Sequence, residues 1–439
     1  MSNPLNRLSL AFAGAFLLVV LATGFWSYVR AEALTARGDN PRRILSERRV
    51  PRGKILDRNG QVLAEAVGTP GEYSRRYSYP GLSSVIGYVS PLYGTAGVEA
   101  AFDPVLHGDE GYDALELWQM GTVLGAPPPG RGVRLTLDLA LQQAADAALG
   151  DRPGAVVLLN TATGEILALA SHPAFDANTL DDTWSALVAD PGSPLLNRAV
   201  LGLYQPGAAL APAMLTSALA MGAVELDQPA NAGALTLGEH TYACRSTTLD
   251  GGVTLAEALR EGCPLALSEL GLSLGGGSLQ SLFEALRLFE PPAIGLPAAA
   301  ATADGAISDP ALAALGQDKL AISPLQLALI TAAIAEHGRL PAPQLVLATQ
   351  GRDGQWHALA PAAAPTEALP PSAADEAAAW MADGYSATAV SNEAGTTLAW
   401  FTAFARGIEG HYAVAVLLES GEVEAAEAIG RAVLAAAGR

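Results

Sequence analysis

The first apolar run of the chain is also its longest. Leu8–Val29 holds no charged side chain, and a helix of about 20 apolar residues crosses the hydrocarbon core of a bilayer. Trp26 and Tyr28 lie near its end, where aromatic residues gather at membrane surfaces. A cleaved signal peptide with Ala31-Glu32-Ala33 at the cleavage site is the alternative, but its apolar stretch is about 7–15 residues. The pattern favours an uncleaved transmembrane helix over residues 8–29, after a tail of residues 1–7.

Two pairs of short apolar runs predict β-hairpins, because each pair flanks a stretch rich in turn residues. The four runs are Ile55-Leu56, Gln61–Ala64, Val156–Leu159 and Ile166–Ala170. Between the two pairs, Pro127–Gly130 predicts a linker. We therefore expect a small, irregular N-terminal module over residues 30–130 and a larger domain over residues 131–439.

The larger domain mixes strand and helix patterns. Asp138 is placed to cap an Ala/Leu/Gln-rich helix, and residues 205–340 are mostly helical in pattern. Trp400–Ala405 and Tyr412–Leu418 read as two late strands, and an Ala-rich helix follows over Ala425–Ala437. Strands, then helices, then strands and a closing helix predict an α+β domain.

Charge is distributed unevenly along the chain. Its formal net charge is −19. Residues 1–60 hold ten basic and four acidic side chains, a balance of +6, so the remainder carries −25. Such an acidic body repels phosphate backbones, which argues against a nucleic-acid partner. Lysine is scarce, since Lys54 and Lys319 are the only two in the sequence.

Two cysteines, Cys244 and Cys263, leave two interpretations open. They form one disulfide if this part of the chain lies outside the cytosol, or they are two buried free thiols. Two cysteines cannot close a structural zinc site, and the six histidines show no metal-binding spacing. We expect neither a metal nor a cofactor.

A series of short motifs occurs in a fixed order along the chain. They are Arg52-Gly53-Lys54-Ile55, Asp57–Gly60, Gly97-Val98-Glu99, Thr136-Leu137-Asp138, Gly164–Ala168, Pro194–Ala199, Tyr204–Gly207, Ile322–Ala328 and Ala399-Trp400-Phe401. One such motif is weak, but the ordered set closely resembles the class B penicillin-binding proteins, the D,D-transpeptidases of cell-wall synthesis. The resemblance implies a penicillin-binding transpeptidase fold, like that of the serine β-lactamases, behind a small N-terminal module and one transmembrane helix.

The family has three active-site motifs, and the first is SxxK. It places a nucleophilic Ser one helical turn before a Lys that takes its proton. In this chain the motif is expected after Pro206-Gly207, where Ala208 stands for the Ser and Ala211 for the Lys. Neither methyl group attacks a carbonyl or carries a proton. No other register restores the motif, because Gly316 and Pro51 stand three residues before the two lysines.

The second motif, SxN, supplies a hydroxyl and an amide. It is expected after Leu255–Leu259, where the chain has Gly262-Cys263-Pro264. Gly262 and Pro264 therefore replace both polar side chains. Pro264 is still suited to start a helix, because the first helical position needs no N–H.

The third motif, KTG, presents a cation and a strand edge to the substrate. We expect it shortly before Trp400, at Glu393, Ala394, Gly395 and Thr396. An acid there takes the place of the Lys and repels an anionic ligand.

One further pattern deserves a structural interpretation. Gly271–Gly275 matches GxSxG, but a nucleophile elbow follows a strand. Here the run Pro264–Leu270 is helical in pattern, so we interpret the glycines as a helix exit.

These losses predict a catalytically inactive family member in peptidoglycan synthesis, held at the cell membrane with its body outside. The resemblance implies a glycan polymerase of the SEDS type, or other cell-wall synthesis proteins, as partners. The arginines that follow residue 29 favour the opposite orientation by the positive-inside rule, which is weak before a long domain. Two alternatives remain: a module that binds peptidoglycan peptides in the old cleft, and an active transpeptidase with an unrecognised nucleophile.

Overall fold

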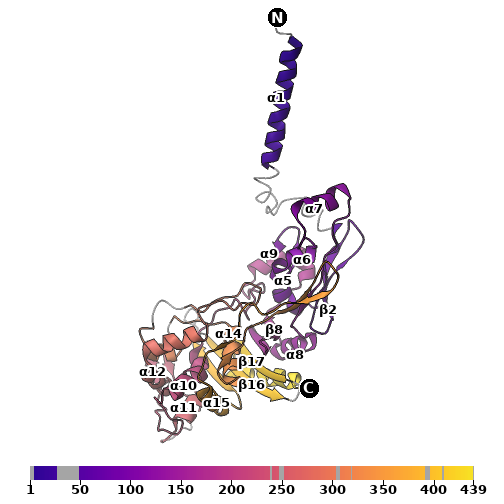
Figure 1. Cartoon of the computed structure of the whole chain (residues 1–439). Helices are drawn as coiled ribbons and strands as arrows, with labels where there is room; N and C mark the ends of the chain where they lie inside the picture. Colours follow the sequence, from indigo (N-terminus) through magenta and orange to yellow (C-terminus); the bar gives the residue numbers. More distant parts are fainter. Residues whose placement is uncertain are drawn as a thin grey trace.

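The computed structural model describes residues 4–26, 49–237, 240–246, 252–302, 307–317, 319–390, 396–407 and 410–438. Helix α1 (Pro4–Gly24) stands apart from the body (Figure 1). Its span Asn6–Gly24 has a mean hydropathy of 1.9 and no buried part, so it is long and apolar enough to cross a membrane. The predicted segment 8–29 extends further, and its residues 27–29 lie outside the described residues.

The N-terminal part of the body is built on a six-stranded sheet with the order β13-β12-β6-β1-β2-β3. The first predicted hairpin is confirmed, because β1 and β2 pair antiparallel. The strands are β1 (Ile55–Leu56), β2 (Val62–Val67), β3 (Ser74–Tyr77), β6 (Val133–Leu135), β12 (Val346–Gln350) and β13 (Trp356–Ala358). The sheet therefore takes strands from both sides of residue 130, where we expected a boundary between domains.

The turn of this hairpin is fixed by one buried carboxylate. Asp57 is fully buried, and its side chain accepts hydrogen bonds from the backbone N–H groups of Asn59 (2.9 Å) and Gln61 (2.7 Å). It also accepts one from the N–H of Leu139, at 3.2 Å. Because a buried carboxylate needs such partners, the hairpin turn is tied to the start of the next domain.

Short elements complete the N-terminal part. They are η2 (Pro80–Leu82), α4 (Ser83–Ile86), β4 (Val89–Ser90), β5 (Gly94–Thr95), α5 (Gly97–Ala101), α6 (Asp103–His107), α7 (Ala114–Trp118) and η3 (Gln119–Val123). Gly87 and Gly97 bring their backbones together: a Cβ on Gly87 would lie 1.9 Å from the carbonyl oxygen of Ala96.

The larger domain is centred on an antiparallel five-stranded sheet with the order β15-β16-β17-β7-β8. One face packs against α14 and the other against α8 and α16. Asp138 caps α8 as predicted, since its side chain accepts from the N–H groups of Ala140 and Leu141. The elements are β7 (Gly154–Asn160), β8 (Ile166–His172), β15 (Tyr385–Val390), β16 (Thr397–Gly407), β17 (Gly410–Leu418), α8 (Leu139–Leu149), α14 (Pro324–Ala335) and α16 (Val423–Ala437).

A mostly helical half lies beside this sheet (Figure 1). Its elements are η5 (Gly207–Leu210), α10 (Ala211–Ala220), β9 (Leu235–Leu237), β10 (His240–Tyr242), α11 (Leu255–Arg260), α12 (Pro264–Ala285), α13 (Pro310–Ala314), β11 (Arg339–Leu340), β14 (Thr366–Glu367) and α15 (Pro371–Trp380). The segment of η4 (Ala177–Thr179) and α9 (Leu180–Ala189) lies instead beside the N-terminal part (Figure 1).

The GxSxG stretch lies in this half, inside α12. The residues directly before it are the first turns of α12 and not a strand, and Gly275 (φ 73°) breaks the helix in two. The glycines therefore form a helix exit, as we expected, and not a nucleophile elbow.

Candidate functional site: a cleft beside an edge strand

Strand β15 is an edge strand of the larger domain's sheet, and it lines a cleft. The cavity measures about 180 Å³. Its walls come from η5, β10, the start of α12, the end of α13 and β15 itself. The residues that line it are Ala208, Thr241, Tyr242, Ala243, Arg245, Gly262, Pro264, Leu267, Leu315, Gln317, Ser386, Ala387, Thr388, Ala389, Val390 and Thr397.

Ala208 and Ala211 differ in their access to the cleft. Ala208 is 5% exposed and lines the cavity, whereas Ala211 is fully buried as the first residue of α10. The helix that we expected at 208–220 is therefore present, as one 3₁₀ turn followed by α10. Gly207 packs against β15 so closely that a Cβ there would lie 2.1 Å from the carbonyl oxygen of Thr388.

The segment of the second motif forms another wall. Gly262 (φ 62°) ends the turn after α11, and Pro264 starts α12. Both line the cleft. Cys263, between them, is bonded to Cys244 in a disulfide whose Cα atoms are 4.2 Å apart. The bond attaches the strand β10 side of the cleft to the start of α12.

The strand that lines the cleft is not the segment to which we assigned the third motif. Glu393, Ala394 and Gly395 lie outside the described residues, and Thr396 is exposed just before β16. The cleft wall is instead β15, Tyr385–Val390. That strand carries no Lys or Arg.

The assignment of the third motif to residues 393–396 stays a prediction, because Glu393, Ala394 and Gly395 lie outside the described residues. A signal for β15 was present in the sequence. Ser386 and Thr388 alternate with Ala387 and Ala389, the period expected of a strand.

Polar groups remain in the cleft, although the sequence did not single them out. Arg245 lines it from the segment after β10, and its guanidinium donates to the carbonyl oxygen of Arg260. The hydroxyl of Tyr242 donates to Gln317 at 2.9 Å, and burial raises the pKa of that hydroxyl. Thr241 adds a second hydroxyl to the lining.

These side chains define what the cleft can do. Covalent acyl transfer needs a nucleophile next to a base. Ala208 carries no hydroxyl or thiol that could act as the nucleophile. Among the described residues that line the cavity, none is a Lys, His, Asp or Glu. Ser386 is engaged with Glu427 of α16, to whose carboxylate it donates at 3.2 Å. The remaining donors and acceptors suit noncovalent binding.

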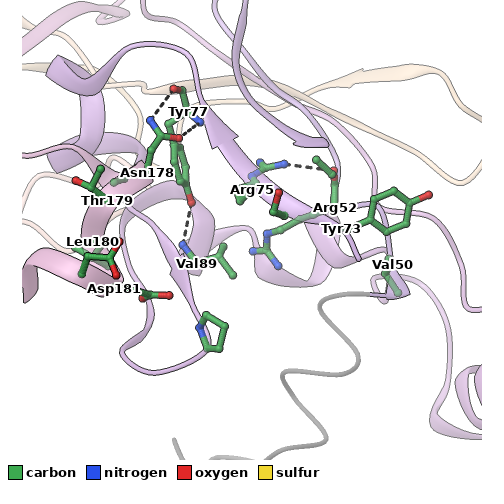
Figure 2. Close-up of a pocket in the computed structure, with 15 residues that line it drawn as sticks. Val50, Arg52, Tyr73, Arg75, Tyr77, Val89, Asn178, Thr179, Leu180 and Asp181 are labelled. Atoms are coloured by element: carbon green, nitrogen blue, oxygen red, sulfur yellow. Dashed lines mark hydrogen bonds between the residues drawn. The ribbon is translucent and has the colours of Figure 1, made fainter. Parts of the chain in front are cut away.

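A second cavity lies in the N-terminal part, between β3 and the η4–α9 segment (Figure 2). It measures about 280 Å³. Tyr77 and Asn178 in its wall are joined by two hydrogen bonds. The N–H of Tyr77 donates to the side-chain oxygen of Asn178 (2.9 Å), and the side-chain nitrogen of Asn178 donates to the carbonyl oxygen of Tyr77 (3.0 Å). The Tyr77 hydroxyl accepts the N–H of Val89 at 2.9 Å. This cavity therefore lies at the junction between the N-terminal part and the larger domain.

Two arginines on the wall of this second cavity share one buried acid. The carboxylate of Glu99 accepts from Nε of Arg52 and from Nε of Arg75, each at 2.6 Å. All three side chains are 5% exposed or less. Such a buried, charged network is expected to stabilise the fold, because each arginine has the carboxylate as its counter-charge.

Comparison with known proteins identifies the family. The model of the penicillin-binding protein transpeptidase domain matches residues 154–436, and that of the penicillin-binding protein A dimerisation domain matches residues 52–133. The chain belongs to the class B penicillin-binding proteins. It is similar to the peptidoglycan D,D-transpeptidase PbpA of Mycolicibacterium smegmatis, with 32% identity over 100% of this chain and 99% of that protein.

Solved penicillin-binding proteins have the same fold. The crystal structure of PBPA from Mycobacterium tuberculosis matches with a TM-score of 0.79 and 29% identity, over 89% of this chain and 100% of that one. A penicillin G acyl-enzyme complex of that protein matches with a TM-score of 0.78 and 31% identity, over the same shares of the two chains. The chain is thus a homologue of a penicillin-binding protein of peptidoglycan synthesis.

The penicillin-binding protein motifs that this chain keeps are structural. Arg52 of the first block pairs with Glu99 of the second. Asn59, also of the first block, donates to Asp138 at 2.8 Å. Ser323 caps α14 in a reciprocal box with Gln326. The sequence therefore resembles its family through residues that hold the fold together.

Proposed function

We propose that this penicillin-binding protein is catalytically inactive and acts as a scaffold or regulator in cell-wall synthesis. The observation that carries the proposal is the pair Ala208, which lines the cleft, and Ala211, which is buried as the first residue of α10. The nucleophile and the base of the family would stand at these two places. The absence of a Lys from β15 supports the same conclusion, because the position that holds the substrate carboxylate also lacks its charge.

The proposed setting is the outer face of the cell membrane. α1 would anchor the chain as its single transmembrane helix, with the body outside. The disulfide between Cys244 and Cys263 supports that side, because disulfides persist in oxidising compartments. The partner we propose is a membrane-embedded glycan polymerase of the SEDS type, bound through α1 and the N-terminal module.

Reaction with penicillin tests the inactivity. Purified protein is incubated with a fluorescent penicillin and separated on a denaturing gel, beside M. tuberculosis PBPA, which forms a penicillin G acyl-enzyme. We expect a band on PBPA and none on this chain. A covalent band that unlabelled penicillin removes would overturn the proposal and favour an unrecognised nucleophile, which peptide mass spectrometry would then locate.

Copurification tests the partnership. The tagged full-length chain is isolated from native membranes, beside a variant with Arg52→Gln, which breaks the buried network of the N-terminal module. We expect a polytopic glycan polymerase with the wild-type chain and much less with the variant. Recovery of the chain without any polymerase would contradict the proposed partner while leaving the inactivity untouched.

A second function is favoured by Arg245. This cation lines the cleft next to the edge of β15, and an edge strand binds an extended peptide through its backbone. The cleft would then hold the terminal carboxylate of a peptidoglycan peptide without reacting. Calorimetry with such a peptide should show about tenfold weaker binding for Arg245→Gln, since a charge-assisted hydrogen bond is lost.

Two controls separate this effect from a general loss of charge. Arg431→Gln removes an exposed arginine of α16, paired with Glu427, and should not change binding. A peptide with an amidated terminus should bind equally to the wild type and to Arg245→Gln. Equal binding of the free-acid peptide to both proteins would refute the role of Arg245.

A further inference from the structure

The N-terminal part carries an apolar loop that the proposed function does not use. Residues 109–129 leave the body after α6 and return before β6. Their tip is formed by α7 and η3, and Figure 1 shows α7 at the end of the body nearest to α1. Four large apolar side chains of the tip are exposed: Leu115 by 69%, Trp118 by 56%, Val123 by 59% and Leu124 by 66%.

The base of this apolar loop is firmly built. Arg352 lies over the ring of Tyr112 at 3.8 Å and donates to the carbonyl oxygen of Gly111 at 2.7 Å. Arg131 donates to the carbonyl oxygen of Glu110 at 2.6 Å. The tip is therefore held out from the body by a fixed base, and its exposure is a feature of the fold.

The neck of the apolar loop lies where the chain arrives from α1. A Cβ on Gly108 would lie 2.5 Å from the carbonyl oxygen of Pro129, so the two ends of the loop touch. The N–H of Gly130 donates to the carbonyl oxygen of Pro51 at 3.2 Å. Pro51 is among the first described residues after α1. The apolar loop therefore lies beside the point where the chain enters the body from α1.

We propose that the tip of the apolar loop inserts into the interface of a lipid bilayer. Leu and Trp side chains on a short, convex helical element are typical of segments that lie at the boundary between headgroups and acyl chains. The inference rests on the membrane anchor of the proposed function and adds a second point of attachment.

The charges of the tip fit a neutral lipid surface. No Lys or Arg occurs in residues 113–124. Its two acids cap α7 reciprocally, with Asp113 accepting the N–H of Glu116 at 2.7 Å and Glu116 accepting the N–H of Asp113 at 3.0 Å. Attraction to anionic headgroups therefore contributes nothing, and insertion is driven by the apolar side chains. With two attachments, the body has a fixed tilt above the membrane.

A fluorescent label at the tip tests the insertion. The full-length variant L115C is labelled with a nitrobenzoxadiazole fluorophore, since both native cysteines are bonded to each other. It is reconstituted in phosphatidylcholine vesicles, with and without brominated acyl chains as quencher. Two matched variants are labelled in the same way: L272C on α12, where the Leu is 61% exposed, and F16C within α1, where the Phe is 73% exposed. Figure 1 shows α12 at the end of the body opposite to α7.

We expect L115C to be blue-shifted and several-fold more quenched than L272C, without any increase when phosphatidylglycerol replaces part of the phosphatidylcholine. If L115C behaves like L272C while F16C is quenched, the inference fails and the anchor stands. If F16C is not quenched either, the anchor itself fails. If L115C is shielded in native membranes but not in pure lipid, the tip binds a protein and the lipid proposal is overturned.

Discussion

The two cavities of this penicillin-binding protein are lined by different kinds of side chain. The cleft of the larger domain is lined by Ala208, Gly262 and Pro264, the residues that we assigned to the first two motifs of the family. The cavity of the N-terminal part has Arg52 and Arg75 on its wall, with Glu99 buried between them. Each of these charges is costly to bury, so the arginines depend on Glu99 as their counter-charge.

The difference shows which residues the fold depends on. Catalytic side chains are placed for chemistry and can be replaced by small apolar residues without opening the core. A buried ion network is different, because the loss of one partner leaves the others charged and unsatisfied. The N-terminal part and its junction with the larger domain should therefore be sensitive to substitution, and the cleft should be tolerant.

The largest expected effect is that of Glu99→Gln. The variant leaves Arg52 and Arg75 buried with a neutral partner, and we expect unfolding to become easier by about 3–5 kcal/mol. Chemical denaturation followed by circular dichroism measures it. Glu65→Gln on β2 is the control, because its partners Lys54 and Arg76 are 58% and 60% exposed. Such surface pairs contribute only about 0–1 kcal/mol, and equal losses in the two variants would contradict the comparison.

The disulfide comes next, since it fastens one wall of the cleft. Cys244 and Cys263 close a loop with a sequence separation of 19. The chain-entropy estimate for a loop of this size gives about 3 kcal/mol. We expect the double variant Cys244→Ala and Cys263→Ala to lose about that much stability, and a reductant to lower the stability of the wild type alone. An unchanged wild type under reducing conditions, with free thiols verified by titration, would speak against the estimate.

A smaller effect should arise at the junction of the two regions. His172 at the end of β8 bonds Asp146 at 2.9 Å, and the hydroxyl of Tyr79 donates to the same carboxylate at 2.9 Å. The hydrogen bond to Asp146 raises the pKa of His172. Because the folded state holds the proton more tightly, the stabilisation is complete below the unfolded pKa of about 6.5 and is lost as pH rises through the folded pKa.

The variant His172→Gln should remove this pH dependence. Its stability deficit relative to the wild type should be larger at acidic pH than at alkaline pH. Thermal unfolding across that range measures the difference, with His357→Gln as the control, because His357 is 59% exposed. A deficit that does not change with pH would mean that His172 acts through packing alone.

Local patterns predicted the elements of this fold well. The two hairpins, the Asp138 cap and the helix that follows Gly207 depend on neighbouring residues and form as expected. Such features are visible in a sequence because capping, turn chemistry and apolar periodicity act over a few positions. The motif order then gave the larger architecture through resemblance to the family.

Contacts between distant segments could not be predicted in the same way. Arg52 and Glu99 are 47 positions apart, and each is a familiar motif residue, but nothing in their spacing shows that they pair. Arg245 reaches the cleft only because β10 and α12 fold beside it. The edge strand β15 was not predicted, although residues 386–389 alternate as in a strand, because its place is fixed by pairing with β16 in the sheet.

The smallest expected effect lies in the cleft itself, at Ala208→Ser. The added hydroxyl faces a cavity of about 180 Å³ in which water can bond to it, so we expect stability to change by less than about 1 kcal/mol. Penicillin should still leave no covalent band, because catalytic groups act as a unit and Ala211 supplies no base. The same denaturation and gel assays measure both outcomes. A stable but reactive variant would show that some other side chain activates the serine, whereas a strongly destabilised variant would show that the cleft is as constrained as the ion network around Glu99.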